Sequence, residues 1–269
     1  MARLAILAGQ GSLPHLIAAA HPNALFGHFE GLTVELPANE TVQLSYERFG
    51  EMFAALSAAG VTEVVFAGGL ARPSLDPTRF DAKMRMLAPG FLAAMQGGDD
   101  GLLRAVIAAF EAEGFTVRGA HELVAGLTAE PGHLAGHEPS ATDLKDAARA
   151  RAILRALGPL DVGQGAVVAG GQALGVETAQ GTDAMLRFVA ATPAGLRQGA
   201  RGVLVKAPKP GQDLRIDMPA IGPATVAAAA EAGLAGIAVV AGQVLLIDRP
   251  ATLAAADDAG LFLVAEPQA

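Results

Sequence analysis

The hydrophobic pattern of the first half alternates between short apolar runs and stretches with helical spacing. Short apolar runs predict buried strands at residues 3–8, 24–29, 61–67 and 115–118. Helices are predicted between these runs, at residues 15–20, 46–59 and 101–113. A chain that alternates strands and helices in this way forms a parallel sheet with helices on both faces, so we predict a Rossmann-like N-terminal domain.

The second half begins after a stretch that has no periodicity. Residues 130–140 contain two prolines, and we place a linker at 133–140, between domains of residues 1–132 and 141–269. Two apolar runs flank Gly170-Gly171, which indicates a β-hairpin over residues 166–177. Further helices are predicted at 143–157, 182–190, 223–232 and 252–259, and further strands at 202–206, within 237–247 and at 261–264. This order predicts a mixed-sheet α/β C-terminal domain.

Composition and charge narrow the classes of function. The 269 residues include 27 acidic and 19 basic side chains, and the net charge of −8 argues against holding nucleic acid by bulk positive charge. The absence of cysteine excludes disulfides, thiolate metal sites and cysteine nucleophiles. Glu231 and Gln243 interrupt the apolar window 224–247, which falls short of the roughly 20 apolar residues of a membrane span. We therefore expect a cytoplasmic protein.

Two glycine-rich loops follow predicted strands of the first domain. Gly9-Gln10-Gly11-Ser12 lies between a strand and a helix, where backbone N–H groups can approach a phosphate. The third glycine of the dinucleotide fingerprint is absent, although Glu30 lies near its acidic position. A plain βα turn with Ser12 as the N-cap is the alternative. The second loop carries Gly68, Gly69 and Arg72. Arg72 is either an anion clamp or a surface arginine.

Three more polar groups stand at the start of predicted helices. They are Asp99-Asp100, Gly181-Thr182-Asp183, and Gly222 with Thr225. Helix capping is the alternative interpretation for the acids and for Thr182. As ligands, Asp99 and Asp100 would suit a uracil edge, ribose hydroxyls or a metal. Glu177, which ends an apolar strand, needs water, a partner or a metal.

The densest polar stretch of the chain runs from Lys206 to Asp217. Its cations are Lys206, Lys209 and Arg215, and these are suited to neutralising a diphosphate. Asp213 and Asp217 are hard oxygen ligands of the kind that Mg²⁺ prefers. The alternative is a solvated loop of self-paired charges.

Six motifs occur in order along nearly the whole chain. They are Leu-Ala-Gly-Gln-Gly-Ser-Leu-Pro (7–14), Gly-Gly-Leu-Ala-Arg-Pro (68–73), Gly-Asp-Asp-Gly-Leu-Leu (98–103), Leu-Asp-Val-Gly-Gln (160–164), Gly-Thr-Asp-Ala-Met-Leu (181–186), and the stretch 202–222. The last contains Lys-x-x-Lys-Pro-x-Gln-Asp-x-Arg-x-Asp-x-Pro, the most specific of them. Together they resemble the UDP-2,3-diacylglucosamine pyrophosphatases of the LpxI type.

The resemblance implies a Mg²⁺-dependent hydrolase of lipid A biosynthesis in Gram-negative bacteria. Such an enzyme cleaves the pyrophosphate bond of UDP-2,3-diacylglucosamine to UMP and 2,3-diacylglucosamine 1-phosphate, also called lipid X. Water attacks the phosphorus on the sugar side. The ligand lies between the two domains, with UMP on the N-terminal side and the catalytic acids, the diphosphate and the acyl-glucosamine on the C-terminal side.

The resemblance also gives roles to individual residues. Asp217 is expected to be the essential acid, which holds Mg²⁺ or the attacking water, and Asp213 is the second choice. Lys206, Lys209 and Arg215 are expected to neutralise the diphosphate. The expected substrate contacts are Gly9, Gln10, Gly11, Ser12, Gly68, Gly69, Arg72, Asp99, Asp100, Gly181, Thr182, Asp183, Lys209, Gln212, Gly222 and Thr225.

Two other functions compete with this interpretation. The first glycine loop and Glu30 favour an NAD(P)-dependent oxidoreductase, and a non-catalytic protein that binds nucleotide sugars or lipids is the other alternative. As partners we expect the substrate and both products, no nucleic acid, and at most transient contact with the inner face of the inner membrane. The sequence is compatible with a homodimer.

Overall fold

The chain folds into two compact units, each of which is described by itself. The structure, a computed structural model, describes residues 2–69, 74–96 and 98–268. The first unit comprises Met1–Ala125 together with Asp213–Asp217, and the second comprises Gly126–Gln212 and Met218–Ala269. Five residues from the second half of the chain therefore belong to the first unit. The two candidate acids, Asp213 and Asp217, are among them, so their predicted place in the C-terminal domain is wrong, because this turn packs against the first unit through Ile216.

The first unit is built on a five-stranded parallel sheet with the order β3-β2-β1-β4-β5. Its strands are β1 (Arg3–Ala8), β2 (Leu25–Phe29), β3 (Thr41–Leu44), β4 (Val61–Ala67) and β5 (Thr116–Arg118). Its helices are α1 (Leu13–Ala20), α2 (Phe49–Ala58), α3 (Ala82–Met95), α4 (Asp99–Ala112) and the short α5 (Ala120–Leu123). The strand order reverses direction between β1 and β4, where open α/β sheets bind their ligands. The predicted Rossmann-like parallel sheet is confirmed.

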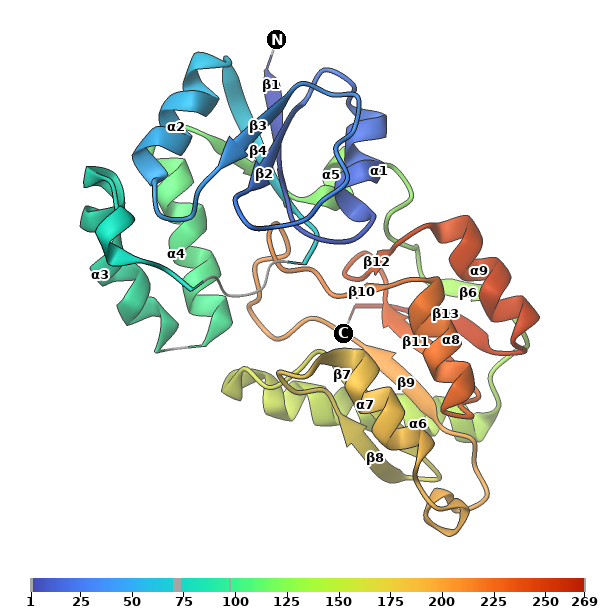
Figure 1. Cartoon of the computed structure of the whole chain (residues 1–269). Coiled ribbons are helices and arrows are strands. Elements are labelled where there is room, and N and C mark those ends of the chain that lie inside the picture. Colours follow the sequence, from blue (N-terminus) through green and yellow to red (C-terminus); the bar gives the residue numbers. More distant parts are fainter. Residues whose placement is uncertain (1, 70–73, 97, 269) are drawn as a thin grey trace. The chain divides into compact units, whose positions relative to one another are not determined.

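Helices cover both faces of this sheet. Helices α1 and α5 pack on one face, and α2, α3 and α4 pack together on the other, as Figure 1 shows. The second face holds the main core of the unit, in which Phe49, Phe53 and Phe110 contact one another. With no tryptophan in the chain, phenylalanine rings and aliphatic side chains fill this core.

The second unit contains a six-stranded mixed sheet with the order β6-β13-β11-β9-β7-β8. Its strands are β6 (Gly132–Ala135), β7 (Gly165–Ala169), β8 (Gln172–Val176), β9 (Val203–Lys206), β11 (Gly236–Val240) and β13 (Phe262–Glu266). Strands β9, β11 and β13 are parallel, whereas β6, β7 and β8 each run antiparallel to a neighbour. The short strands β10 (Ala220–Ile221) and β12 (Leu245–Leu246) pair separately. The predicted mixed sheet is confirmed.

Helices cover this sheet unequally. Helix α6 (Ala141–Leu157) packs on one face, against β7 and β9. The other face is covered by α7 (Gly181–Ala190), α8 (Pro223–Glu231) and α9 (Arg249–Asp258). Single 3-10 turns lie at Pro77–Arg79 in the first unit and at Gly158–Leu160 and Ala194–Arg197 in the second. None of the helices within the described residues is long and apolar enough to cross a membrane.

The linker predicted at 133–140 is misplaced. Most of β6 lies inside that range, and its backbone pairs antiparallel with β13 at the edge of the second sheet. The two units instead divide after Ala125. The sequence pattern failed here because an exposed edge strand is held by backbone hydrogen bonds, so it needs no apolar alternation to form.

Asp146 of helix α6 fixes the β7–β8 hairpin that the Gly170-Gly171 motif predicts. Its side chain is buried, and its two carboxylate oxygens accept hydrogen bonds from the N–H groups of Gly170 and Gly171 at 2.8 and 2.7 Å. Asp146→Ala should lower the free energy of unfolding by about 2–4 kcal/mol, because both N–H groups lose their acceptor. Chemical denaturation measures this. The exposed Asp258→Ala is the control and should change stability by less than about 0.5 kcal/mol.

Candidate functional site

The two glycine loops of the first unit meet at the carboxyl ends of β1 and β4. Gln10 and Gly69 form an antiparallel bridge, in which the Gln10 N–H donates to Gly69 O at 2.8 Å and the Gly69 N–H donates to Gln10 O at 2.9 Å. The Gly9 N–H donates to Ala67 O at 2.7 Å. The sequence predicted both loops at this edge of the sheet, and the structure brings them into direct contact at the point where the strand order reverses.

Close backbone approach explains two of these glycines. A Cβ atom on Gly9 would lie 2.6 Å from Gly69 O, and one on Gly68 would lie 2.4 Å from Gln10 O. Gly68 also has a φ of +89°, a conformation that costs an L-residue about 1–2 kcal/mol. These glycines are therefore needed for the loop structure itself, independently of any ligand.

Substituting Gly68 should destabilise the fold much more than substituting Gly69. Gly68→Ala should lower the free energy of unfolding by about 3 kcal/mol, from the positive φ and the clash with the Gln10 carbonyl. Gly69→Ala is the matched control, because nothing lies within 4 Å of its added Cβ. Urea denaturation of both variants measures the difference. Equal stabilities would contradict the close approach of the two loops.

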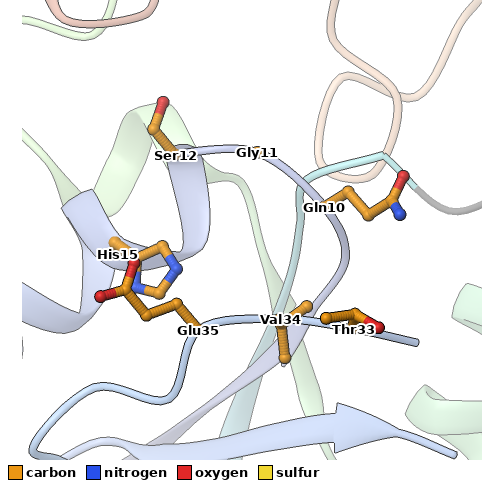
Figure 2. Close-up of a pocket in the computed structure, with 7 residues that line it drawn as sticks. All are labelled: Gln10, Gly11, Ser12, His15, Thr33, Val34 and Glu35. Atoms are coloured by element: carbon orange, nitrogen blue, oxygen red, sulfur yellow. The ribbon is translucent and has the colours of Figure 1, made fainter. Parts of the chain in front are cut away.

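A pocket of about 450 Å³ opens beside the first loop. It is lined by Gln10, Gly11, Ser12, His15, Thr33, Val34 and Glu35. Figure 2 shows these residues, with the side chain of His15 coming from the helix that follows the loop. Ser12 occupies the N-cap position of α1, but its side chain makes no capping hydrogen bond. Ser12 thus has the N-cap position that the alternative interpretation gives it, without a hydrogen bond from its side chain.

The remaining candidates of the first unit are placed as follows. Glu30, the acid near the dinucleotide position, pairs with Arg79 at 2.5 Å and is not part of the pocket lining. Asp99 and Asp100 begin helix α4, and Asp100 pairs with Arg104 one turn later, at 3.3 Å. Arg72 lies outside the described residues.

Asp213–Asp217 forms a single turn in the first unit. The N–H groups of Ile216 and Asp217 donate to the carbonyl oxygen of Asp213 at 3.3 and 3.2 Å. The Asp213 carboxylate closes the same turn by accepting from the Arg215 N–H at 3.0 Å. Ile216 packs against the core of this unit. The two candidate acids are thus the first and last residues of one turn.

The contacts of the Asp213 carboxylate lie within its own turn. The Arg215 guanidinium donates to both Asp213 oxygens, at 3.0 Å from Nε to Oδ1 and 2.6 Å from Nη2 to Oδ2. Its hydrogen bonds hold the pKa of Asp213 below the usual value, so this carboxylate is ionised and engaged by its own loop. Asp217 is half-buried at the other end of the turn. The Asp213 carboxylate is thus bound by Arg215, and the role of Asp217 as the essential acid stays a prediction.

The same geometry tests whether a divalent cation fits. Among the described residues, no three carboxylate or histidine side chains converge as a protein-only metal site. Mg²⁺ commonly uses one or two carboxylates and completes its shell with water and substrate phosphates. A site of this second kind fits the Asp213–Asp217 turn if one carboxylate of the turn and phosphate oxygens of a substrate are the donors.

Lys206 in the second unit lies in a buried ion pair. Its Nζ lies 2.9 Å from Glu177 Oε2 and donates to Thr182 Oγ1 at 2.8 Å, while Thr182 Oγ1 lies 3.0 Å from Glu177 Oε1. The Lys206 side chain is 4% exposed and that of Glu177 is 13% exposed. Glu177 thus has the partner that its position required. The Lys206 ammonium group thus has two partners within the protein. Its contact with a diphosphate stays a prediction.

The other predicted contacts of the second unit stand near the ends of helices and turns. Gly181, Thr182 and Asp183 form the first turn of α7. The Lys209 ammonium group pairs with the Asp161 carboxylate. The backbone N–H of Lys209 donates to Gln212 Oε1 at 2.9 Å.

Gly222 and Thr225 lie at the start of α8. The Gly222 N–H donates to Thr225 Oγ1 at 3.4 Å.

Sequence reasoning missed several residues around these sites. His15 on α1 and Thr33 and Glu35 after β2 line the pocket, and their place in the segments that follow two neighbouring strands is the signal that points to them. His121 was also missed. Its Nδ1 is buried without a hydrogen-bond partner among the described residues, and no sequence pattern indicates this.

Comparisons with known proteins match the two halves of the chain to two family models. The family model described as LpxI N-terminal domain matches residues 3–127, and the one described as LpxI C-terminal domain matches residues 130–264. A protein of Caulobacter vibrioides, named UDP-2,3-diacylglucosamine pyrophosphatase LpxI, is 42% identical over 277 aligned residues. The alignment covers 100% of this chain and 99% of the relative. The chain therefore belongs to the LpxI family.

Proposed function

We propose that this protein hydrolyses the pyrophosphate bond of UDP-2,3-diacylglucosamine in lipid A biosynthesis. The products are UMP and 2,3-diacylglucosamine 1-phosphate. The observation that carries the proposal is the full-length relationship, at 42% identity, to a protein named for this pyrophosphatase activity. The placement of a candidate acid and a glycine-loop pocket in the same unit supports it.

The pocket beside the glycine loop is suited to the UMP half of the substrate. Backbone N–H groups of a glycine loop at a helix N-terminus favour phosphate oxygens. The pocket adds hydroxyl, amide, imidazole and carboxylate groups that can pair with ribose and uracil. In this proposal Gly9 and Gly68 shape the loops, while Gln10, Gly11 and Ser12 face the ligand.

Asp217 is proposed to orient the attacking water and to hold Mg²⁺ together with substrate oxygens. Mg²⁺, when bound, would neutralise charge on the diphosphate, a role that hard cations play in phosphoryl transfer. Water attacks the phosphorus on the sugar side, the bond from that phosphorus to the bridging oxygen breaks, and UMP leaves with the bridging oxygen. One proton is released to solvent.

The experiment is incubation of purified protein with UDP-2,3-diacylglucosamine, with Mg²⁺ or with chelator, in water enriched in oxygen-18. Mass spectrometry should find both products only with Mg²⁺, and should find the label in 2,3-diacylglucosamine 1-phosphate. Label in UMP would overturn the proposed point of attack. Unchanged substrate in folded protein would overturn the proposed function.

We further propose cytoplasmic action with transient contact at the inner face of the inner membrane, where a diacylated substrate resides. The net charge of −8 disfavours adhesion to anionic lipids through bulk charge. Vesicle flotation with and without substrate tests this. Binding that depends on the substrate supports transient contact, whereas strong binding to anionic vesicles alone contradicts it.

A further inference from the structure

Arg215 is held from two sides within the first unit. Its Nε and Nη2 donate to Asp213, and its Nη1 lies 2.7 Å from Oε1 of Glu111 on helix α4. One guanidinium thus joins the Asp213–Asp217 turn to a helix about a hundred residues earlier in the sequence. These two carboxylates raise the pKa of Arg215 above its usual value, so its positive charge is permanent.

The same helix also carries Arg104, which precedes Glu111 by seven residues, or two helical turns. After the hydrogen bonds of Arg215, the positive charge of Arg104 is a further cause of the lowered pKa of Asp213. The backbone of Arg215 also approaches Gly119, where an added Cβ would lie 3.5 Å from Arg215 Cα. The turn is therefore positioned by Glu111 of α4, by the segment before α5, and by the packing of Ile216.

We propose that Arg215 and Glu111 are positioning residues that fix the location of Asp217. The inference rests on the proposed function, in which Asp217 acts on the reacting phosphate. It replaces the expectation that Arg215 neutralises the diphosphate. Asp217 follows Arg215 by two residues, and its N–H closes the turn that Arg215 anchors. A shift of Asp217 by about 1 Å would be enough to lower the rate severely.

The two roles of Arg215 predict different kinetics. If Arg215 binds the substrate diphosphate, Arg215→Gln should raise KM and Glu111→Gln should have little effect. If Arg215 and Glu111 together position Asp217, each single variant should lower kcat, and the double variant Glu111→Gln/Arg215→Gln should lower it no further. Both side chains are partly exposed, at 35% for Arg215 and 46% for Glu111, so their pairing contributes little to stability.

The test is a double-mutant cycle on the full chain. We expect Glu111→Gln and Arg215→Gln each to lower kcat about tenfold, the double variant to match the more severe single one, and KM to stay within about twofold. Arg215→Lys should recover part of the activity. Glu113→Gln is the matched control: Glu113 caps the same helix end and pairs with Lys83, not with the turn. Additive losses, or a KM raised only by Arg215→Gln, would overturn the proposal.

A second readout does not depend on turnover. Hydrogen–deuterium exchange of residues 213–217 should become faster in Glu111→Gln and in Arg215→Gln, with thermal unfolding almost unchanged. Unchanged exchange would overturn the positioning role even if the wild-type enzyme is active. Wild-type protein that does not hydrolyse the substrate would overturn the proposed function, and the exchange data would still report whether Glu111 and Arg215 hold the turn.

Discussion

Asp217→Asn should lower the turnover of UDP-2,3-diacylglucosamine by about 10²–10⁴-fold, the range that a positioned acid or base contributes. Asparagine has nearly the same shape as aspartate but carries no charge, so it cannot hold a cation or draw a proton from water. The turn should survive, because the hydrogen bond of residue 217 within it comes from the backbone N–H. Steady-state kinetics with Mg²⁺, together with chemical denaturation, measure both parts of the prediction.

Two further substitutions make this prediction specific. Asp258→Asn, on an exposed position of helix α9, should leave turnover unchanged. Asp213→Asn should lower turnover less than Asp217→Asn, because the Asp213 carboxylate binds the backbone of the turn and the Arg215 guanidinium. A larger loss in Asp213→Asn would exchange the roles of the two acids, and near-wild-type turnover in Asp217→Asn would remove Asp217 from the mechanism.

The alternation of strands and helices was predictable because most core elements bury a continuous apolar run or one helix face. The exceptions are informative. Helix α3 was missed because Pro89 and Gly90 lie inside it, and both residues usually indicate a break. Its start is nevertheless marked by Asp81, whose side chain accepts from the Met84 N–H. Strand β3 was missed because most of its residues are exposed or half-buried at the sheet edge.

The candidate site was predictable where local sequence determines local geometry. The glycine loops lie where the strand–loop–helix pattern placed them, because strand ends fix the position of the loops that follow. The partners of the charged residues were not predictable in this way. Glu111 is 104 positions from Arg215, and Glu177 is 29 positions from Lys206, and only the folded chain brings either pair together. Sequence reasoning therefore identified the charged stretch but not the different tasks of its members.

Lys206→Met should be the most destabilising of the charge substitutions in that stretch, with an expected loss of about 3–5 kcal/mol in the free energy of unfolding. Methionine preserves much of the aliphatic stem that strand β9 buries but removes the ammonium group. Glu177 and the Thr182 hydroxyl then lose their cationic partner. Urea denaturation measures the loss, and the exposed Lys145→Met, expected to stay within about 0.5 kcal/mol, is the control.

The double variant Lys206→Met/Glu177→Gln separates the two causes of this loss. If the cost arises from leaving the Glu177 carboxylate uncompensated, neutralising that carboxylate should restore a large part of the stability, because a neutral amide is far less costly to bury than an unpaired charge. If the cost arises from packing around β9 instead, the second substitution should add to the first. A Lys206→Met variant as stable as Lys145→Met would contradict the buried pair itself, and would return Lys206 to the diphosphate role that its sequence motif predicts.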